Sequence, residues 1–119
     1  MEKQGKVSLW VGKFDSREVL DSFLNETYDE DGELSSDFMN EFEIDFIDNQ
    51  FQEVYFYEGI SDKKEIFDGF SYIDSFIKNI PDMNWAEKNT ILLLYNFEYS
   101  KKIDDKKIEF IDCYDFIED

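Results

Sequence analysis

Residues 90–99 read Thr90-Ile-Leu-Leu-Leu-Tyr-Asn-Phe-Glu-Tyr99, the most apolar run of the chain. A short continuous apolar run is typical of a strand that is buried on both faces. We therefore expect residues 90–99 to form a central strand of a sheet. Residues 106–116 carry a second strand pattern, and the polar turn between the two segments predicts that they form a hairpin.

A further strand pattern lies near the start of the chain, at residues 6–12. Val7, Leu9 and Val11 point to one side of such a strand, and Trp10 points to the other. If a second layer of structure covers that other side, Trp10 belongs to the core. If the side is open, Trp10 is a candidate interface residue.

The remaining patterns are one more strand, at residues 51–58, and three segments with helical spacing behind a capping residue. The helical segments are residues 16–27, capped by Asp15 or Ser16; residues 36–42, capped by Ser35 or Ser36; and residues 72–80, capped by Ser71 with Asp74 and ended by Pro81. This order predicts one α+β domain over residues 1–119. We expect a sandwich with two to three helices on one face of a mostly antiparallel sheet of about four strands.

The charge of the chain is strongly one-sided. It carries 30 Asp or Glu against 12 Lys or Arg, a formal net charge of −18. Residues 18–62 hold 15 of these acids and no Lys or Arg. Because 42% of the residues are hydrophobic and 18% are aromatic, we expect a folded core rather than disorder. An acidic exterior of this kind repels anions and attracts cations, which indicates a basic partner.

The residue types argue against catalysis. The chain has no histidine, the usual general base, and no glycine-rich phosphate loop. The one cysteine, Cys113, follows Asp112 and precedes Asp115 by two residues. Nearby negative charge raises the pKa of a thiol, so we expect Cys113 to serve packing. Residues 29–32 resemble part of a calcium loop, but the acids needed at its first and last positions are absent. We expect no enzyme activity, no cofactor and no metal site.

The predicted contact surface is the block from Tyr28 to Glu58, which combines acidic and aromatic residues. Direct binding of nucleic acid is not expected, because phosphate contacts require Lys and Arg. A protein with a basic cleft fits instead, with tyrosines as anchors, although partial burial is the alternative for each tyrosine. The expected contact residues are Tyr28, Asp29, Glu30, Asp31, Glu33, Asp37, Glu41, Glu43, Asp45, Asp48, Glu53, Tyr55 and Tyr57.

Two other roles remain open on these observations. The chain fits an acidic nucleic-acid mimic that inhibits a DNA- or RNA-binding protein. It also fits a structural or regulatory subunit whose acidity serves solubility and whose binding is independent of salt. The chain has no apolar run of signal-peptide or membrane-span length, so we expect a cytoplasmic protein without membrane contact. The oligomeric state does not follow from the sequence.

An ordered series of motifs in the first half of the chain resembles the immunity protein 22 family. The motifs are Lys6-Val-Ser-Leu-Trp-Val-Gly-Lys-Phe14, Tyr28-Asp-Glu-Asp-Gly32, Ser36-Asp-Phe38, Phe42, Ile44-Asp-Phe-Ile-Asp48 and Phe51-Gln-Glu53. The resemblance implies a small cytoplasmic protein that binds and neutralises a cognate toxin of a bacterial polymorphic toxin system. Together with the charge, it leads us to expect a basic, nuclease-like toxin, because opposite charge accelerates association.

Overall fold

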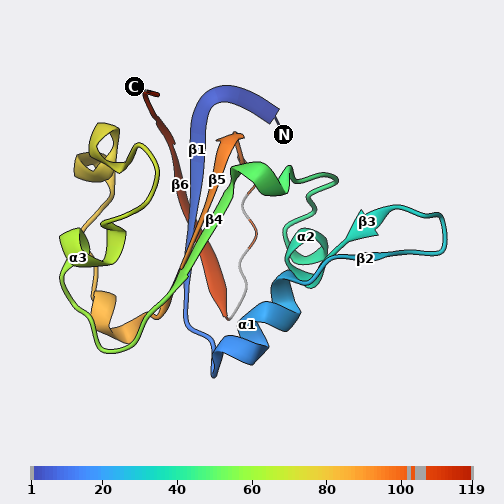
Figure 1. Cartoon of the computed structure of the whole chain (residues 1–119), viewed down its shortest axis with the longest axis horizontal. Coiled ribbons are helices and arrows are strands. Elements are labelled where there is room, and N and C mark those ends of the chain that lie inside the picture. The colour runs from blue at the N-terminus through green and yellow to red at the C-terminus, as the bar shows by residue number, and fades with distance from the viewer. Residues whose placement is uncertain (1, 102, 104–106, 119) are drawn as a thin grey trace.

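The centre of the fold is a four-stranded antiparallel sheet with the strand order β4-β5-β1-β6 (Figure 1). The computed structural model describes residues 2–101, 103 and 107–118. Within them, the strands are β1 (Glu2–Gly12), β2 (Thr27–Tyr28), β3 (Leu34–Ser35), β4 (Gln52–Phe56), β5 (Thr90–Phe97) and β6 (Ile108–Asp115). The α-helices are α1 (Arg17–Leu24), α2 (Asp37–Glu41) and α3 (Lys63–Phe67), and 3₁₀ helices cover Asn49–Phe51, Ile73–Ser75, Ile77–Asn79 and Trp85–Glu87.

The two middle positions of the sheet belong to β1 and β5. Every residue of β5 except Asn96 is buried, which confirms the predicted central strand. The predicted hairpin between residues 90–99 and 106–116 is wrong, because β1 lies between β5 and β6 and pairs with both. A strand with apolar side chains on both faces, such as β1, is stable only inside a sheet. This requirement outweighs the advantage of the short turn that would pair β5 directly with β6. Residues 102 and 104–106 of that predicted turn and strand lie outside the described residues.

Helices cover both faces of the sheet, whereas the sequence patterns predicted one covered face. Figure 1 shows α1 and α2 on one side of the sheet and α3 on the other. The first side packs against Trp10 and the second against Val7, Leu9 and Val11. The α+β class and the antiparallel sheet are confirmed, but each face of β1 is apolar and each is covered. Trp10 is fully buried and is therefore a core residue.

Serine side chains begin the first two helices. Ser16 accepts a hydrogen bond from the Val19 backbone N–H, and Ser36 accepts one from the Met39 backbone N–H. These bonds satisfy backbone donors that have no partner inside the helix. Of the two capping residues that the sequence allowed in each case, the structure therefore selects Ser16 and Ser36.

Residues 72–80 do not form the predicted helix. Tyr72 takes a left-handed conformation with φ of 57°, and two 3₁₀ helices follow it. The expected cap at Ser71 does not form, because its backbone N–H and its hydroxyl both donate to the carboxylate of Glu53 on β4. The short helix α3, capped by Asp62, was not predicted.

Candidate functional site

The fold divides the acidic block of residues 28–58 among three places. Residues 28–33 form the end of the β2–β3 hairpin, which projects from the molecule at the side opposite α3 (Figure 1). Residues 37–48 form α2 and the loop after it. Residues 52–56 form β4, an edge strand of the main sheet. The predicted contact residues therefore come from three different elements of the fold.

The tip of the hairpin is held by Asp29. One oxygen of its carboxylate accepts hydrogen bonds from the backbone N–H groups of Asp31 and Glu33, both at 2.9 Å. The Asp29 backbone N–H also donates to the Glu33 carbonyl at 2.8 Å. The side chains of Glu30, Asp31 and Glu33 are exposed, and Tyr28 is 75% exposed. The tip thus presents carboxylates and one aromatic ring on a backbone that is already ordered.

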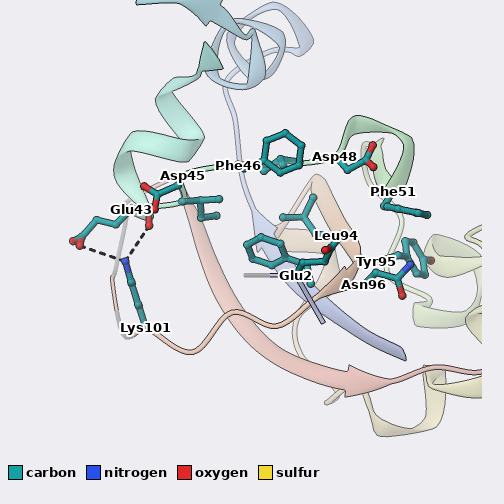
Figure 2. Close-up of a pocket in the computed structure, with 13 residues that line it drawn as sticks. Glu2, Glu43, Asp45, Phe46, Asp48, Phe51, Leu94, Tyr95, Asn96 and Lys101 are labelled. Carbon is teal, nitrogen blue, oxygen red and sulfur yellow. Dashed lines mark hydrogen bonds and ion pairs between the residues drawn. The ribbon is translucent and has the colours of Figure 1, made fainter. Parts of the chain in front are cut away.

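Helix α2 presents Asp37 and Glu41 on its exposed side, and the loop after it lines a pocket of about 370 Å³. Figure 2 shows Glu43 and Lys101 at one end of this pocket and Phe51 and Asn96 at the other. The lining residues are Glu2, Glu43, Ile44, Asp45, Phe46, Ile47, Asp48, Phe51, Leu94, Tyr95, Asn96, Phe97 and Lys101. Three of the predicted contact residues, Glu43, Asp45 and Asp48, are therefore brought together at one hollow.

The loop that lines the pocket is fixed at its start. The Lys101 ammonium donates to the Glu43 carbonyl at 3.0 Å and lies 3.6 Å from the Glu43 carboxylate. The Tyr99 hydroxyl donates to the Phe42 carbonyl at 2.7 Å. Farther along, the Asp48 carboxylate accepts from the Gln50 backbone N–H at 3.0 Å. The bonds of Lys101 and Tyr99 hold the start of the loop against the body of the protein, and the Asp48 bond caps the 3₁₀ helix that follows the loop.

The predicted contact residues on β4 are directed into the fold to different degrees. Tyr57, just after the strand, is buried, and its hydroxyl donates to the Trp85 carbonyl at 3.0 Å. Burial, followed by the nearby Tyr55, raises the pKa of Tyr57 to about 12. The Glu53 carboxylate is occupied by Ser71, and Tyr55 is 38% exposed and stacks on Tyr57. Glu53, Tyr55 and Tyr57 are therefore all engaged by other residues of the fold.

Sequence reasoning singled out three of the thirteen lining residues and missed the others, among them Phe46, Phe51 and Glu2. Phe46 is 69% exposed and stands between Asp45 and Asp48, and Phe51 is 38% exposed. Glu2 reaches the pocket only because β1 pairs with the end of β5. No sequence pattern marks Phe46 as exposed: it lies between Ile44 and Ile47 in the sequence, and the fold buries both isoleucines.

The part of the chain that the structure describes offers little support for a reactive cysteine, a metal site or a membrane span. Cys113 lies half-buried on β6, and burial is the main cause that raises its thiol pKa, which suppresses the reactive thiolate. The described residues contain no group of three or more His, Cys, Asp or Glu side chains that could hold a metal ion. None of the helices described is both long and apolar enough to span a membrane.

Comparison with known protein families gives a match over most of the chain. A family model described as Immunity protein 22 matches residues 7–116, which is most of the chain. No curated protein and no solved structure matches the chain. The matched range includes the hairpin, α2, the loop that lines the pocket, β4, β5, β6 and the part of β1 from Val7 onward.

Proposed function

Because the chain belongs to the immunity protein 22 family, we propose that it neutralises a cognate bacterial toxin by binding a basic surface of that toxin. The proposed contact surface, here called the acidic face, consists of the hairpin tip and of α2 with the loop that lines the pocket. Its members are Tyr28, Asp29, Glu30, Asp31, Glu33, Asp37, Glu41, Glu43, Asp45, Phe46 and Asp48. The protein acts by binding and not by catalysis.

The observation that carries this proposal is the loop of residues 43–48. It places an exposed aromatic side chain, Phe46, between the carboxylates of Asp45 and Asp48 beside a pocket. Protein interfaces are enriched in aromatic anchors, and Phe46 is exposed together with Phe51 at the same pocket. The combination of an apolar anchor with surrounding acids favours a basic protein partner.

The net charge of the whole chain also suggests how the complex forms. A net charge of −18 attracts a cationic protein over a distance and orients it before contact. Electrostatic steering of this kind raises association rates to about 10⁸–10⁹ M⁻¹s⁻¹ at low salt. A toxin that acts on nucleic acid has a cationic cleft, because its substrate is an anion. We therefore propose a nuclease-like toxin and a cytoplasmic site of action.

Binding of the toxin domain encoded beside the gene for this chain tests the proposal. We expect Asp45→Asn/Asp48→Asn to weaken binding by about tenfold or more and to reduce its salt dependence. Asparagine at position 48 retains an oxygen that can accept the Gln50 N–H. The matched control is Asp68→Asn/Asp74→Asn, which removes the same charge from exposed positions near α3.

The control variant is expected to bind as the unmodified protein does, apart from a small change in association rate. Protection of cells that express the toxin should follow the same order. Failure of the unmodified protein to bind or to protect would reject the proposed function. Equal weakening by both variants would mean that net charge alone, and not the acidic face, determines binding.

A further inference from the structure

The pocket beside Phe46 combines an apolar floor with an acidic rim. Leu94 and Phe97 of β5 and the buried Ile44 and Ile47 supply apolar lining. At about 370 Å³, the pocket falls within the range of about 300–1,000 Å³ that is typical of sites for small ligands. An α-helix with its side chains is about 10–12 Å across, so this volume suits one or two side chains and not a whole element.

The rim of the pocket keeps a negative net charge after Lys101 has paired with Glu43. Lys101 is the basic residue among the lining residues, and its ammonium is engaged by the carbonyl and the carboxylate of Glu43. Glu2, Asp45 and Asp48 are the other lining acids. The pocket therefore has an acidic surplus and an apolar floor, which together complement a cationic group on an apolar stem.

The backbone on both walls of the pocket is in an unfavourable conformation. Glu43 has φ of 54° and Asn96 has φ of 56°, and both line the pocket. Non-glycine residues adopt this region at a cost, and such residues gather at binding sites whose shape must be fixed in advance. Asn96 is held by its side-chain oxygen, which accepts from the Gly5 N–H at 3.0 Å, and Glu43 is held by Lys101. The pocket is thus ordered before any partner arrives.

We propose that this pocket receives an arginine side chain of the toxin, together with an apolar side chain next to it. The guanidinium lies over the exposed ring of Phe46 and pairs with Asp45 or Asp48, while the neighbouring apolar side chain rests on Leu94. Arginine fits better than lysine because its planar group stacks on an aromatic ring and binds a carboxylate through two hydrogen bonds. This inference rests on the proposed function and identifies where its strongest contact forms.

A short peptide tests the chemistry of the pocket without the toxin. The probe is acetyl-Leu-Arg-Leu-amide, titrated into the ¹⁵N-labelled protein, and the control is the same peptide with citrulline, which is neutral and has nearly the same shape. We expect the arginine peptide to shift the amide signals of residues 45–48 and 94–96 and to bind about tenfold or more tightly than the control. Equal binding of both peptides, or shifts confined to residues 29–33, would overturn the proposal.

The variant Phe46→Ala tests the same contact in the complex with the toxin. The side chain is 69% exposed, so its removal leaves the core intact. Ile117→Ala is the matched control, because Ile117 is 64% exposed and its backbone N–H is bonded to Ser75, away from the pocket. We expect Phe46→Ala to weaken toxin binding by about tenfold or more, mainly through faster dissociation, and Ile117→Ala to have no effect.

The two proposals fail in different ways. If the unmodified protein does not bind the toxin, the proposed function is rejected, and this inference with it. If the unmodified protein binds the toxin and Phe46→Ala binds equally well, the proposed function stands and the arginine pocket is rejected. If Phe46→Ala weakens toxin binding and the peptide shifts occur at residues 45–48, both proposals are supported.

Discussion

The hydroxyl of Tyr99 donates a hydrogen bond to the carbonyl of Phe42 at 2.7 Å, joining the chain after β5 to the end of α2. Both rings also pack against Trp10, with centroid distances of 5.1 Å for Tyr99 and 5.8 Å for Phe42. Glu43, the first residue of the loop that lines the pocket, follows Phe42 directly. This buried bond therefore helps to connect the hydrophobic core to the start of the acidic loop.

Replacing Tyr99 with phenylalanine removes this bond and keeps the ring. We expect Tyr99→Phe to lower the free energy of unfolding by about 1–3 kcal/mol, because the buried Phe42 carbonyl loses its hydroxyl donor. Urea denaturation measures the change, and hydrogen exchange of the amides in residues 44–47 should become faster. The control is Tyr114→Phe. The Tyr114 hydroxyl is buried without a hydrogen-bond partner among the described residues, so its removal should cost little. Equal losses for the two variants would contradict this account.

A second prediction concerns the contact between β1 and β6 at Gly12. A Cβ atom at this position would lie 2.3 Å from the Lys107 carbonyl oxygen and 2.8 Å from the Ile108 Cα. Both are backbone atoms, so the strands must separate to admit a methyl group. We expect Gly12→Ala to destabilise the protein by about 1–3 kcal/mol. An unchanged midpoint of urea denaturation would show that the backbone of β6 adjusts at this point without cost.

Local patterns predicted the parts of the fold that depend on local physics. The alternation of residues 6–12 separated Trp10 from Val7, and the structure places them on opposite faces of the sheet. Serine residues ahead of helical spacing marked α1 and α2 correctly, because a cap is satisfied within three residues. The central position of β5 followed from its continuous apolar run.

Long-range partners determined what the sequence could not predict. Ser71 was expected to cap a helix, but its backbone N–H and its hydroxyl both donate to Glu53 of a distant strand. The order of the sheet depends on β1 pairing with strands at the other end of the chain. The pocket was not predicted for the same reason, because Glu2, Asp45 and Asn96 meet only after the sheet has formed.

A third prediction follows from the burial of Tyr114. Burial, followed by the charge of Asp112, raises the pKa of Tyr114 to about 12, whereas an unfolded tyrosine titrates near 10. The folded state therefore favours the neutral phenol. Its contribution to stability is complete below about pH 10 and is lost as the pH rises from about 10 to about 12. Urea denaturation between pH 8 and pH 11 should show this loss, and Tyr114→Phe should show less of it. Identical pH dependence in the two proteins would contradict the assignment to Tyr114.

A fourth prediction concerns the acidic exterior as a whole. Repulsion among the acids opposes folding, and salt screens it, since the Debye length falls from about 30 Å at 0.01 M to about 8 Å at 0.15 M. We expect the melting temperature to rise with sodium chloride over this range. Sucrose at matched osmolarity is the control for general solvent effects. A flat or falling trend would mean that the carboxylates are already well compensated in the folded protein.

The last prediction separates the two parts of the acidic face. The hairpin tip is exposed and carries Glu30, Asp31 and Glu33, whereas the pocket offers an enclosed contact. Exposed charges at the rim of an interface change mainly the association rate, and buried contacts change mainly the dissociation rate. We therefore expect Glu30→Gln/Asp31→Asn/Glu33→Gln to slow association with the toxin and to flatten its salt dependence, with little change in dissociation. Surface plasmon resonance across a salt series measures both rates.

The design of this variant protects the shape of the hairpin. Asp29 is retained because its carboxylate holds the backbone N–H groups of Asp31 and Glu33, and those groups are unchanged by the substitutions. The comparison is Asp45→Asn/Asp48→Asn, which should speed dissociation instead. If the hairpin variant speeds dissociation as much as the loop variant does, the hairpin tip is itself enclosed in the complex. The anchor would then extend over the whole acidic face, because a contact that only steers cannot slow the departure of a partner already bound.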